Sequence, residues 1–243
     1  MKRLTVMLSK NFWKLPGLWL RLCHYAKHAA RYPESVKYGC VQYIFQQASC
    51  SGNVQLEIFG TENIPQQGSF MMYANHQGKF DSVAIAASCD TPIGVVMKKE
   101  LCGNPFMKRV MACTGSFGMD RENVRQSLEV INRVTQQVQQ GRSFLIFPEG
   151  EANRCSNRVG EFHPGCFRCA LRTGCPVLPV ALVDCFKPMD FPGSHPVTVQ
   201  VHYLKPITQE EYRGMTTREL SDLVHSRICQ AISLHTPSEK TAV

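Results

Sequence analysis

The 243-residue sequence has no apolar run long enough to cross a membrane, since a helical span needs about 20 consecutive apolar residues. Its start also lacks the basic end, long apolar middle and small-residue cleavage site of a secretory signal. It has no internal repeat or low-complexity tract. Hydrophobic residues make up 44% and charged residues 19%, which favours a folded domain over a disordered chain. We therefore expect a protein of the reducing cytosol that lies on a membrane without crossing it.

Acidic side chains are almost absent from the first 50 residues, where Glu34 stands against eight lysines and arginines. That segment carries +7 (8 − 1), whereas the other 193 residues carry 19 basic and 18 acidic side chains, or +1. Such an asymmetry predicts an anionic partner at this end. A membrane surface, a nucleic acid and an acidic carrier protein all fit, and a solvated basic face without a partner is the plainer alternative.

Cysteine is plentiful, with twelve residues, but regular spacing is lacking. Cys166 and Cys169 form one close pair, with Cys155 and Cys175 nearby. Structural zinc usually needs two such pairs. We therefore expect free thiols, as in a reducing compartment, and no metal site.

Tryptophan occurs only twice, at Trp13 and Trp19, among leucines and cations in residues 11–31. Tryptophan flanked by cations at an apolar boundary is typical of a helix that lies in a membrane interface. Residues 33–49 predict a second helix. We expect residues 1–50 to form basic amphipathic helices, a two-helix membrane-docking motif. The alternative is a helical hairpin that packs on the domain by its apolar face.

From residue 54 onward, segments with strand and helix periodicity alternate. The expected strands are 54–59, 70–74, 93–97, 116–119, 144–147, 177–183 and 197–203. The expected helices are 81–87, 105–111, 124–138, 166–171 and a last one that begins with Thr216 and Glu219 at capping-box spacing. Several strands are apolar from end to end, as in sheets covered on both faces. Residues 51–243 therefore predict an α/β domain, with a mixed, largely parallel β-sheet flanked by helices.

The strongest chemical signal is NHQGKFD, residues 75–81, between a buried strand and a helix. Ligand sites in α/β sheets form at the carboxyl ends of strands. The carboxylate of Asp81 can orient the imidazole of His76 and fix its tautomer, which leaves the other ring nitrogen as a general base. The alternative is a polar loop in which Asp81 caps the helix and His76 has no role.

Two further strand ends carry charged side chains. The sequence Phe-Pro-Glu-Gly at 147–150 holds Glu149 in a rigid turn, although a solvated glutamate is the simpler explanation. Arg121 follows another strand, where a fixed guanidinium suits bidentate capture of a phosphate. A salt bridge from Arg121 to Asp120 or Glu122 is the alternative.

Four blocks follow one another in a fixed order: NHQGKFD (75–81), GSFGMDR (115–121), FPEGEANR (147–154) and VLPVAL (177–182). Together they resemble the glycerolipid acyltransferase family typified by 1-acyl-glycerol-3-phosphate acyltransferase. The resemblance covers a core of about residues 71–186. The basic N-terminus is similar to the two-helix membrane-docking motif of bacterial members.

The resemblance implies transfer of a fatty acyl group from acyl-CoA or acyl carrier protein to the sn-2 hydroxyl of lysophosphatidate, forming phosphatidate. It implies that His76 is the general base and that Asp81 orients it. Because the acceptor hydroxyl itself attacks the thioester, neither an acyl-enzyme nor a cofactor is expected. Arg121 is expected to hold the acceptor phosphate, with Glu149 and Gly150 shaping that site. The implied location is peripheral, on the cytoplasmic face of the membrane.

The third block departs from the family pattern. Thr-Arg after Phe-Pro-Glu-Gly is replaced by Glu151-Ala152, so an arginine that helps to bind phosphate is missing from its place. Arg154 is expected to substitute for it. Lys98 and Lys99 are further phosphate ligands by this interpretation, or simple surface charge. Because an acid near a phosphate is unfavourable, another lysophospholipid or hydroxyl acceptor is the alternative.

Two other functions compete with this one. A cysteine-nucleophile acyltransferase needs a thiol beside His76, and neither Cys89 nor Cys102 is expected there. A non-enzymatic lipid- or nucleic-acid-binding module accounts for the basic N-terminus but leaves the four blocks unexplained. The sequence has no helix-turn-helix, zinc or RNA-binding signature, so we expect no nucleic-acid partner.

Overall fold

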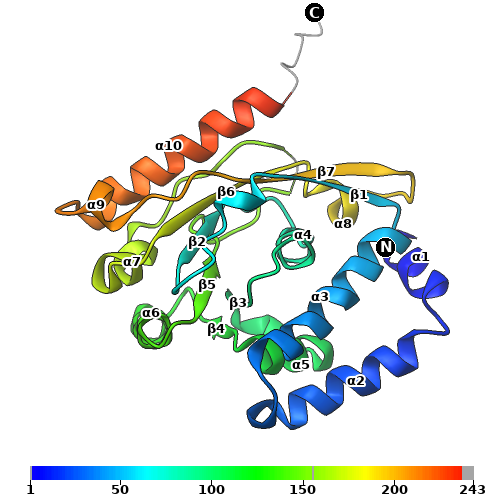
Figure 1. The fold of residues 1–243 in the computed structure, drawn as a ribbon. Helices are drawn as coiled ribbons and strands as arrows, with labels where there is room; N and C mark the ends of the chain where they lie inside the picture. Colours follow the sequence, from blue (N-terminus) through cyan, green and yellow to red (C-terminus); the bar gives the residue numbers. More distant parts are fainter. Residues whose placement is uncertain (1, 155, 237–243) are drawn as a thin grey trace, which may run out of the picture.

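The computed structural model describes residues 2–154 and 156–236 (Figure 1). A sheet in the order β1-β7-β6-β2-β5-β3-β4 forms its centre. The strands are β1 (Val54–Phe59), β2 (Met71–Ala74), β3 (Ile93–Lys98), β4 (Phe117–Met119), β5 (Ser143–Ile146), β6 (Val177–Val183) and β7 (Val197–Tyr203). Neighbouring strands are parallel except β6 and β7, which are antiparallel. The expected mixed, largely parallel sheet is confirmed.

Helices cover both faces of the sheet (Figure 1). One face carries α6 (Val124–Gln139), α7 (Arg168–Thr173) and α10 (Thr217–His235), and the other carries α3 (Glu34–Ser51), α4 (Asp81–Ser88) and α5 (Pro105–Thr114). Because side chains alternate along a strand, Tyr73 and Ile146 join the first core, whereas Met72 and Leu145 join the second. All residues of β2, β5 and β6 are buried, which explains their continuous apolar sequences.

Shorter helices complete the described chain: α8 (Lys187–Asp190), α9 (Gln209–Tyr212), and the 3-10 turns η1 (Ala29–Arg31), η2 (Thr61–Asn63), η3 (Lys99–Gly103) and η4 (Pro164–Phe167). Helix α10 begins at the predicted capping box, in which Thr216 and Glu219 bond each other's backbone. A second capping box starts α9. Both boxes satisfy amide groups that a helix start leaves without partners.

The first 51 residues contain three helices, one more than the sequence predicted. Helix α1 (Lys2–Lys10) precedes α2 (Leu15–Lys27) and α3. In α1, the guanidinium of Arg3 is buried and donates hydrogen bonds to the carbonyls of Gly52 (2.6 Å) and His195 (2.8 Å). Helix α1 is therefore tied to the domain by polar contacts with residues far along the chain.

A separate core cluster joins these helices to the domain. Leu22 of α2, Val41 and Phe45 of α3 and Val110 of α5 pack together. Arg109 of α5 also lies 4.6 Å from the ring centre of Trp19, a distance that suits a cation–π contact. Helix α3 thus forms part of the domain, and α1 and α2 pack on it through the buried side chains of Met7 and Leu22. The division of the chain at residue 50 stays a prediction. Within residues 2–154 and 156–236, no helix is both long and apolar enough to span a membrane.

Candidate active site

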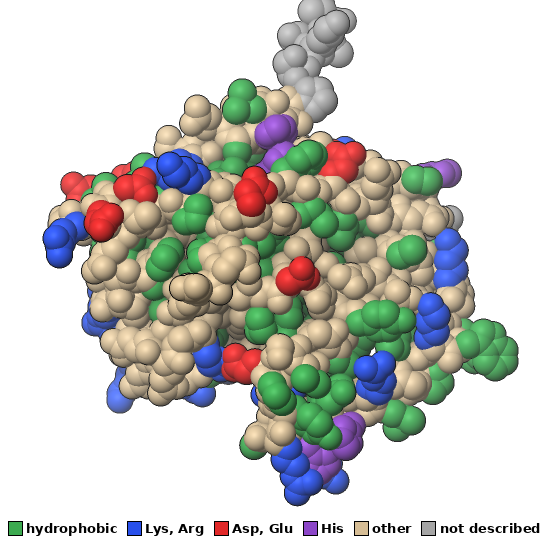
Figure 2. All heavy atoms as spheres, viewed as in Figure 1, with side chains coloured by type: hydrophobic (Ala, Val, Ile, Leu, Met, Phe, Trp, Pro, Cys, Tyr) green, Lys and Arg blue, Asp and Glu red, His purple; other side chains and the backbone are tan. Residues whose placement is uncertain are grey.

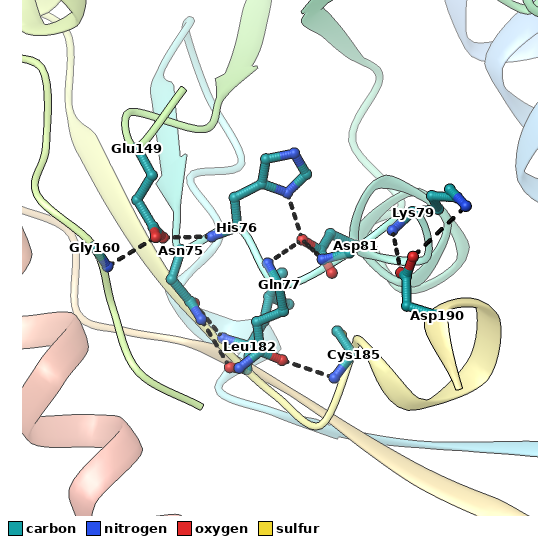
Figure 3. A network of polar contacts seen from close by, with 11 residues as sticks. Asn75, His76, Gln77, Lys79, Asp81, Glu149, Gly160, Leu182, Cys185 and Asp190 are labelled. Atoms are coloured by element: carbon teal, nitrogen blue, oxygen red, sulfur yellow. Dashed lines mark hydrogen bonds and ion pairs between the residues drawn. The ribbon is translucent and has the colours of Figure 1, made fainter. Parts of the chain in front are cut away.

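A histidine and a carboxylate meet where β2 gives way to α4. His76 Nδ1 lies 2.7 Å from Asp81 Oδ2 (Figure 3). The same oxygen accepts hydrogen bonds from the backbone amides of Gln77 (2.6 Å) and Gly78 (2.9 Å). Asp81 is the first residue of α4, and its carboxylate turns back into the preceding loop. The spacing of five positions therefore does bring the carboxylate to the imidazole.

The environments of the two groups differ. The Asp81 side chain is wholly buried, whereas that of His76 is 19% exposed. Burial raises the pKa of Asp81, and the hydrogen bonds from His76 and the loop amides oppose that rise. The imidazole stacks on Phe147, with ring centres 4.4 Å apart. Because Asp81 occupies Nδ1, the remaining ring nitrogen, Nε2, is free to accept a proton from a substrate.

The two neighbours of His76 are fixed by amide side chains. Asn75 accepts from the amide of Leu182 (2.7 Å) and donates to its carbonyl (3.0 Å), which ties the loop to β6. Gln77 accepts from the amide of Cys185 (2.7 Å). Asn75 and Gln77 are both buried. These supports were not predicted, because their partners lie more than 100 positions away in the sequence.

Glu149 supports the backbone of the same loop. The amide of His76 donates to its Oε1 (2.6 Å), and the amide of Gly160 donates to its Oε2 (2.8 Å) (Figure 3). Burial raises the pKa of Glu149. Gly150 has a φ of +79°, and a Cβ there would lie 3.1 Å from His163 Nε2, so this turn favours glycine. Neither Glu149 nor Gly150 lines the cavity described next.

His76 opens into a cavity of about 1260 Å³ between the N-terminal helices and the sheet. Its charged lining residues lie at or just beyond the carboxyl ends of β2, β3, β4 and β5, as His76 does, whereas the lining from α1 and α2 is apolar. The apolar lining from these two helices consists of Leu4, Met7, Leu8, Leu15, Leu18, Trp19 and Leu22. A cavity with one charged end and one apolar end fits a ligand with the same two ends.

Arg121 lines the charged end and is half-buried. Burial lowers the pKa of its guanidinium. Among the described residues, no carboxylate forms an ion pair with it, because Asp120 pairs with Lys99 instead (3.3 Å). The local salt bridge considered from the sequence is therefore not formed, and Arg121 is available to a ligand.

The other predicted cations are placed differently from one another. Arg154 is exposed and lines the cavity. Lys98 lines it too and pairs with Glu100 (3.7 Å). Lys99 does not line it. The structure thus brings Arg121, Arg154 and Lys98 to the charged end and leaves Lys99 outside.

Several thiols of the described residues are buried, which works against their activation as nucleophiles. Burial raises the pKa of Cys89 to about 12 and that of Cys166 to about 11, and it raises the pKa of Cys185 as well. A nucleophilic cysteine needs the opposite shift. Cys155 lies outside the described residues. Among the residues that are described, no three histidine, cysteine or acidic side chains are placed to hold a metal ion.

Comparison with known proteins identifies the family. The family model described as Acyltransferase matches residues 55–183, which is 129 of the 243 residues. The chain belongs to the acyltransferase family. The match begins in β1 and ends in β6, so it includes the His76–Asp81 pair and all four sequence blocks.

This acyltransferase is similar to curated proteins named 1-acyl-sn-glycerol-3-phosphate acyltransferase. It is 29% identical to that of Borreliella burgdorferi over 131 residues, covering 54% of this chain and 52% of the relative. It is also 29% identical to that of Escherichia coli strain K12 over 167 residues, covering 68% of each chain. The chain thus spans from about half to about two thirds of the length of these relatives.

A solved structure supports the fold of this acyltransferase. The crystal structure of the 1-acyl-sn-glycerophosphate (LPA) acyltransferase PlsC from Thermotoga maritima superposes with a TM-score of 0.74. The likeness covers 93% of this chain and 91% of that one, at 18% sequence identity. The two proteins therefore share a fold over most of their length.

Proposed function

We propose that this acyltransferase moves a fatty acyl group from a thioester to the sn-2 hydroxyl of lysophosphatidate, forming phosphatidate. The observation that carries the proposal is the His76–Asp81 pair at the charged end of a cavity that is apolar elsewhere. The names of the curated relatives point to the same acceptor. The headgroup is proposed to lie by the cations, and the acyl chains in the apolar part.

In the proposed reaction the acceptor hydroxyl donates a hydrogen bond to His76 Nε2. As its oxygen attacks the thioester carbonyl carbon, the proton passes to Nε2, and Asp81 stabilises the imidazolium that forms. The attack forms the new C–O bond and a tetrahedral intermediate. Collapse of this intermediate restores the carbonyl and breaks the C–S bond. The imidazolium returns its proton to the leaving thiolate, so neither an acyl-enzyme nor a cofactor takes part.

The direct test is acyl transfer from labelled donors to lysophosphatidate. Palmitoyl-CoA and palmitoyl acyl carrier protein are offered in separate reactions, because either thioester is a possible co-substrate. Labelled product that co-migrates with phosphatidate is the expected result for at least one donor. Absence of transfer from both donors, under conditions where a relative is active, would refute the proposed activity.

Arg121→Ala and Arg154→Ala are each expected to raise the KM for lysophosphatidate by about tenfold or more, with a smaller effect on kcat. The reason is that a charge-assisted hydrogen bond to phosphate contributes binding in both ground and transition states. Steady-state kinetics over a range of acceptor concentrations measures the split. Lys108→Ala is the matched control, because Lys108 is an exposed lysine of α5 that does not line the cavity. If Arg154→Ala changes neither constant, Lys98 becomes the second phosphate ligand.

We also propose that α1 and α2 dock the enzyme on an anionic leaflet, at the cytoplasmic face of the membrane. Hydrophobic, Lys, Arg and His side chains gather around these helices (Figure 2). Phe12, Trp13 and Leu20 are 64%, 91% and 68% exposed. Arg21 and Lys27 of α2 form no ion pair with any described residue. Exposed aromatic residues beside free cations suit a lipid headgroup layer.

The double variant Phe12→Ser, Trp13→Ser is expected to weaken binding to anionic liposomes by at least about tenfold, because two large apolar side chains lose their burial in lipid. Co-sedimentation measures the bound fraction, and high salt is expected to release part of the intact protein. This variant is cleaner than deletion of residues 1–50, which would remove Val41 and Phe45 from the core.

The matched control for docking is Val124→Ser, because Val124 is 81% exposed on α6, outside the N-terminal helices. It is expected to bind liposomes as the intact protein does. If the Phe12 and Trp13 double variant also binds undiminished, the docking proposal fails. The basic segment would then be better explained as a dock for an acidic acyl carrier protein.

A further inference from the structure

The charged end of the cavity holds carboxylates as well as cations. Its acidic lining residues are Glu100, Asp120, Glu122 and Glu151. The first two are neutralised by lysines, at 3.7 Å and 3.3 Å. The side chains of Glu122 and Glu151 form neither an ion pair nor a hydrogen bond with the part of the chain that the structure describes.

The cations that line the cavity also include two that are paired with carboxylates and two that are not. Lys79 pairs with Asp190 (3.6 Å), and Lys98 is one of the two lysines already paired. Arg121 and Arg154 have no carboxylate within ion-pair distance in residues 2–154 and 156–236. When the ion pairs are set aside, two guanidinium groups and two carboxylates face the ligand space. The formal charges at the charged end of the cavity therefore sum to zero.

A phosphate monoester gives the two free carboxylates at the charged end no partner. A phosphate monoester carries a charge of about −1.5 to −2 at neutral pH. Two free carboxylates oppose that charge while two arginines attract it. A phosphodiester that also bears a protonated amine has no net charge, and it offers one group to the arginines and one to a carboxylate.

Glu151 is the carboxylate best placed for the amine. It follows the Gly150 turn, where the family pattern has Thr-Arg, and it lines the cavity with an exposed side chain. Arg121 and Arg154 line the same cavity. The position that would carry a further cation is Ala152. The cavity lining thus has an anion next to the position where the family pattern has a cation.

We propose that Glu151 is a specificity-determining residue, and that the acceptor site takes lysophospholipids whose phosphate carries an amine-bearing headgroup. The phosphate lies on Arg121 and Arg154, and the ammonium group lies on Glu151. The hydroxyl that is acylated stays at His76. This inference rests on the acyltransferase function proposed above and adds a class of acceptor to lysophosphatidate.

The test compares lysophosphatidate with lysophosphatidylethanolamine of the same acyl chain, in detergent micelles and with one donor. The intact enzyme is expected to acylate both. Glu151→Gln is expected to lower kcat/KM for the amine-bearing acceptor and to raise it for lysophosphatidate, so that their ratio shifts by about tenfold. Glu151→Asp keeps the charge and is expected to keep the preference of the intact enzyme.

Glu161→Gln is the matched control, because Glu161 is an exposed glutamate of the same loop that does not line the cavity. Its acceptor ratio is expected to equal that of the intact enzyme. The inference is overturned if lysophosphatidate is acylated while the amine-bearing acceptor is not, or if Glu151→Gln leaves the ratio unchanged. The proposed function itself fails if the intact enzyme does not acylate lysophosphatidate, whatever its activity toward the amine-bearing acceptor.

Discussion

Replacing His76 with alanine is expected to lower kcat/KM for acyl transfer by about 10²–10⁴-fold, the usual contribution of a positioned general base. The imidazole is the group that Asp81 orients at 2.7 Å and that reaches the cavity. Without it, the acceptor hydroxyl must lose its proton to water while it attacks the thioester. Initial rates at subsaturating acceptor give kcat/KM directly.

The same variant is expected to stay folded. His76 is partly exposed and belongs to no core cluster. Its replacement removes a ring contact with Phe147 and the hydrogen bond to Asp81, whose carboxylate keeps the hydrogen bonds from two loop amides. Far-ultraviolet circular dichroism and a thermal melt check this. His195→Ala is a suitable control, because His195 is exposed and contributes its carbonyl, not its ring, to the contact with Arg3. Residual activity of His76→Ala above about one per cent would rule out the general-base role.

Local patterns in the sequence predicted much of the domain. The bounds of β6 and β7 agree with their apolar and alternating runs, and the start of α10 agrees with its capping box. The contact between His76 and Asp81 was also predictable, because a tight turn at the end of a strand brings side chains five positions apart together. These features are determined by residues close to one another in the sequence, so local sequence patterns predict them.

Features that depend on distant residues were not predictable. Helix α1 was missed because its anchor, Arg3, finds acceptors at Gly52 and His195, 49 and 192 positions away. In the sequence, an arginine that will be buried looks the same as one that will be exposed. The basic count of the N-terminus therefore overstated the number of free cations, since Arg3 is used inside the protein.

The sequence also did not predict which way the charged side chains of the site point. Glu149 was expected to shape the acceptor site, and the structure shows that both its oxygens bind backbone amides behind His76. For Arg121, nearby acids suggested a local salt bridge, yet Asp120 turns toward Lys99. A strand end gives the place of a charged residue, whereas its orientation depends on which partner the folded chain brings near.

Asp81→Asn is expected to lower kcat by roughly 10³-fold, less completely than removal of the base itself. The carboxylate fixes the tautomer of His76 and stabilises the imidazolium, and a neutral amide does neither. The amide can also present its NH₂ group to Nδ1, which leaves the proton on the nitrogen that must act as base. The effect is expected in kcat more than in KM, because Asp81 does not line the cavity.

The thermal stability of Asp81→Asn is expected to equal or exceed that of the intact enzyme at neutral pH. Burial raises the pKa of Asp81 above its value in the unfolded chain, so folding disfavours the ionised form. That cost is absent below the pKa of the unfolded chain, where both states are protonated. It grows as pH rises from the unfolded pKa to the folded pKa, and it is constant above the folded pKa. Asparagine does not ionise, so the variant does not bear the free-energy cost of burying a charge. The gain in Tm is therefore expected to shrink as pH falls toward about 4.

Asp190→Asn is the matched control for Asp81→Asn. Asp190, in α8, is a nearly buried carboxylate that binds Lys79 of the loop that carries His76. It makes no contact with His76 (Figure 3). Its substitution is expected to leave most of kcat, because the tautomer and charge of the imidazole are unchanged. If the two variants lose equal activity, Asp81 acts by holding the loop and not through the imidazole. A large fall in Tm for Asp81→Asn alone at neutral pH would contradict the stability argument, because the hydrogen bonds of the carboxylate would then outweigh its burial cost.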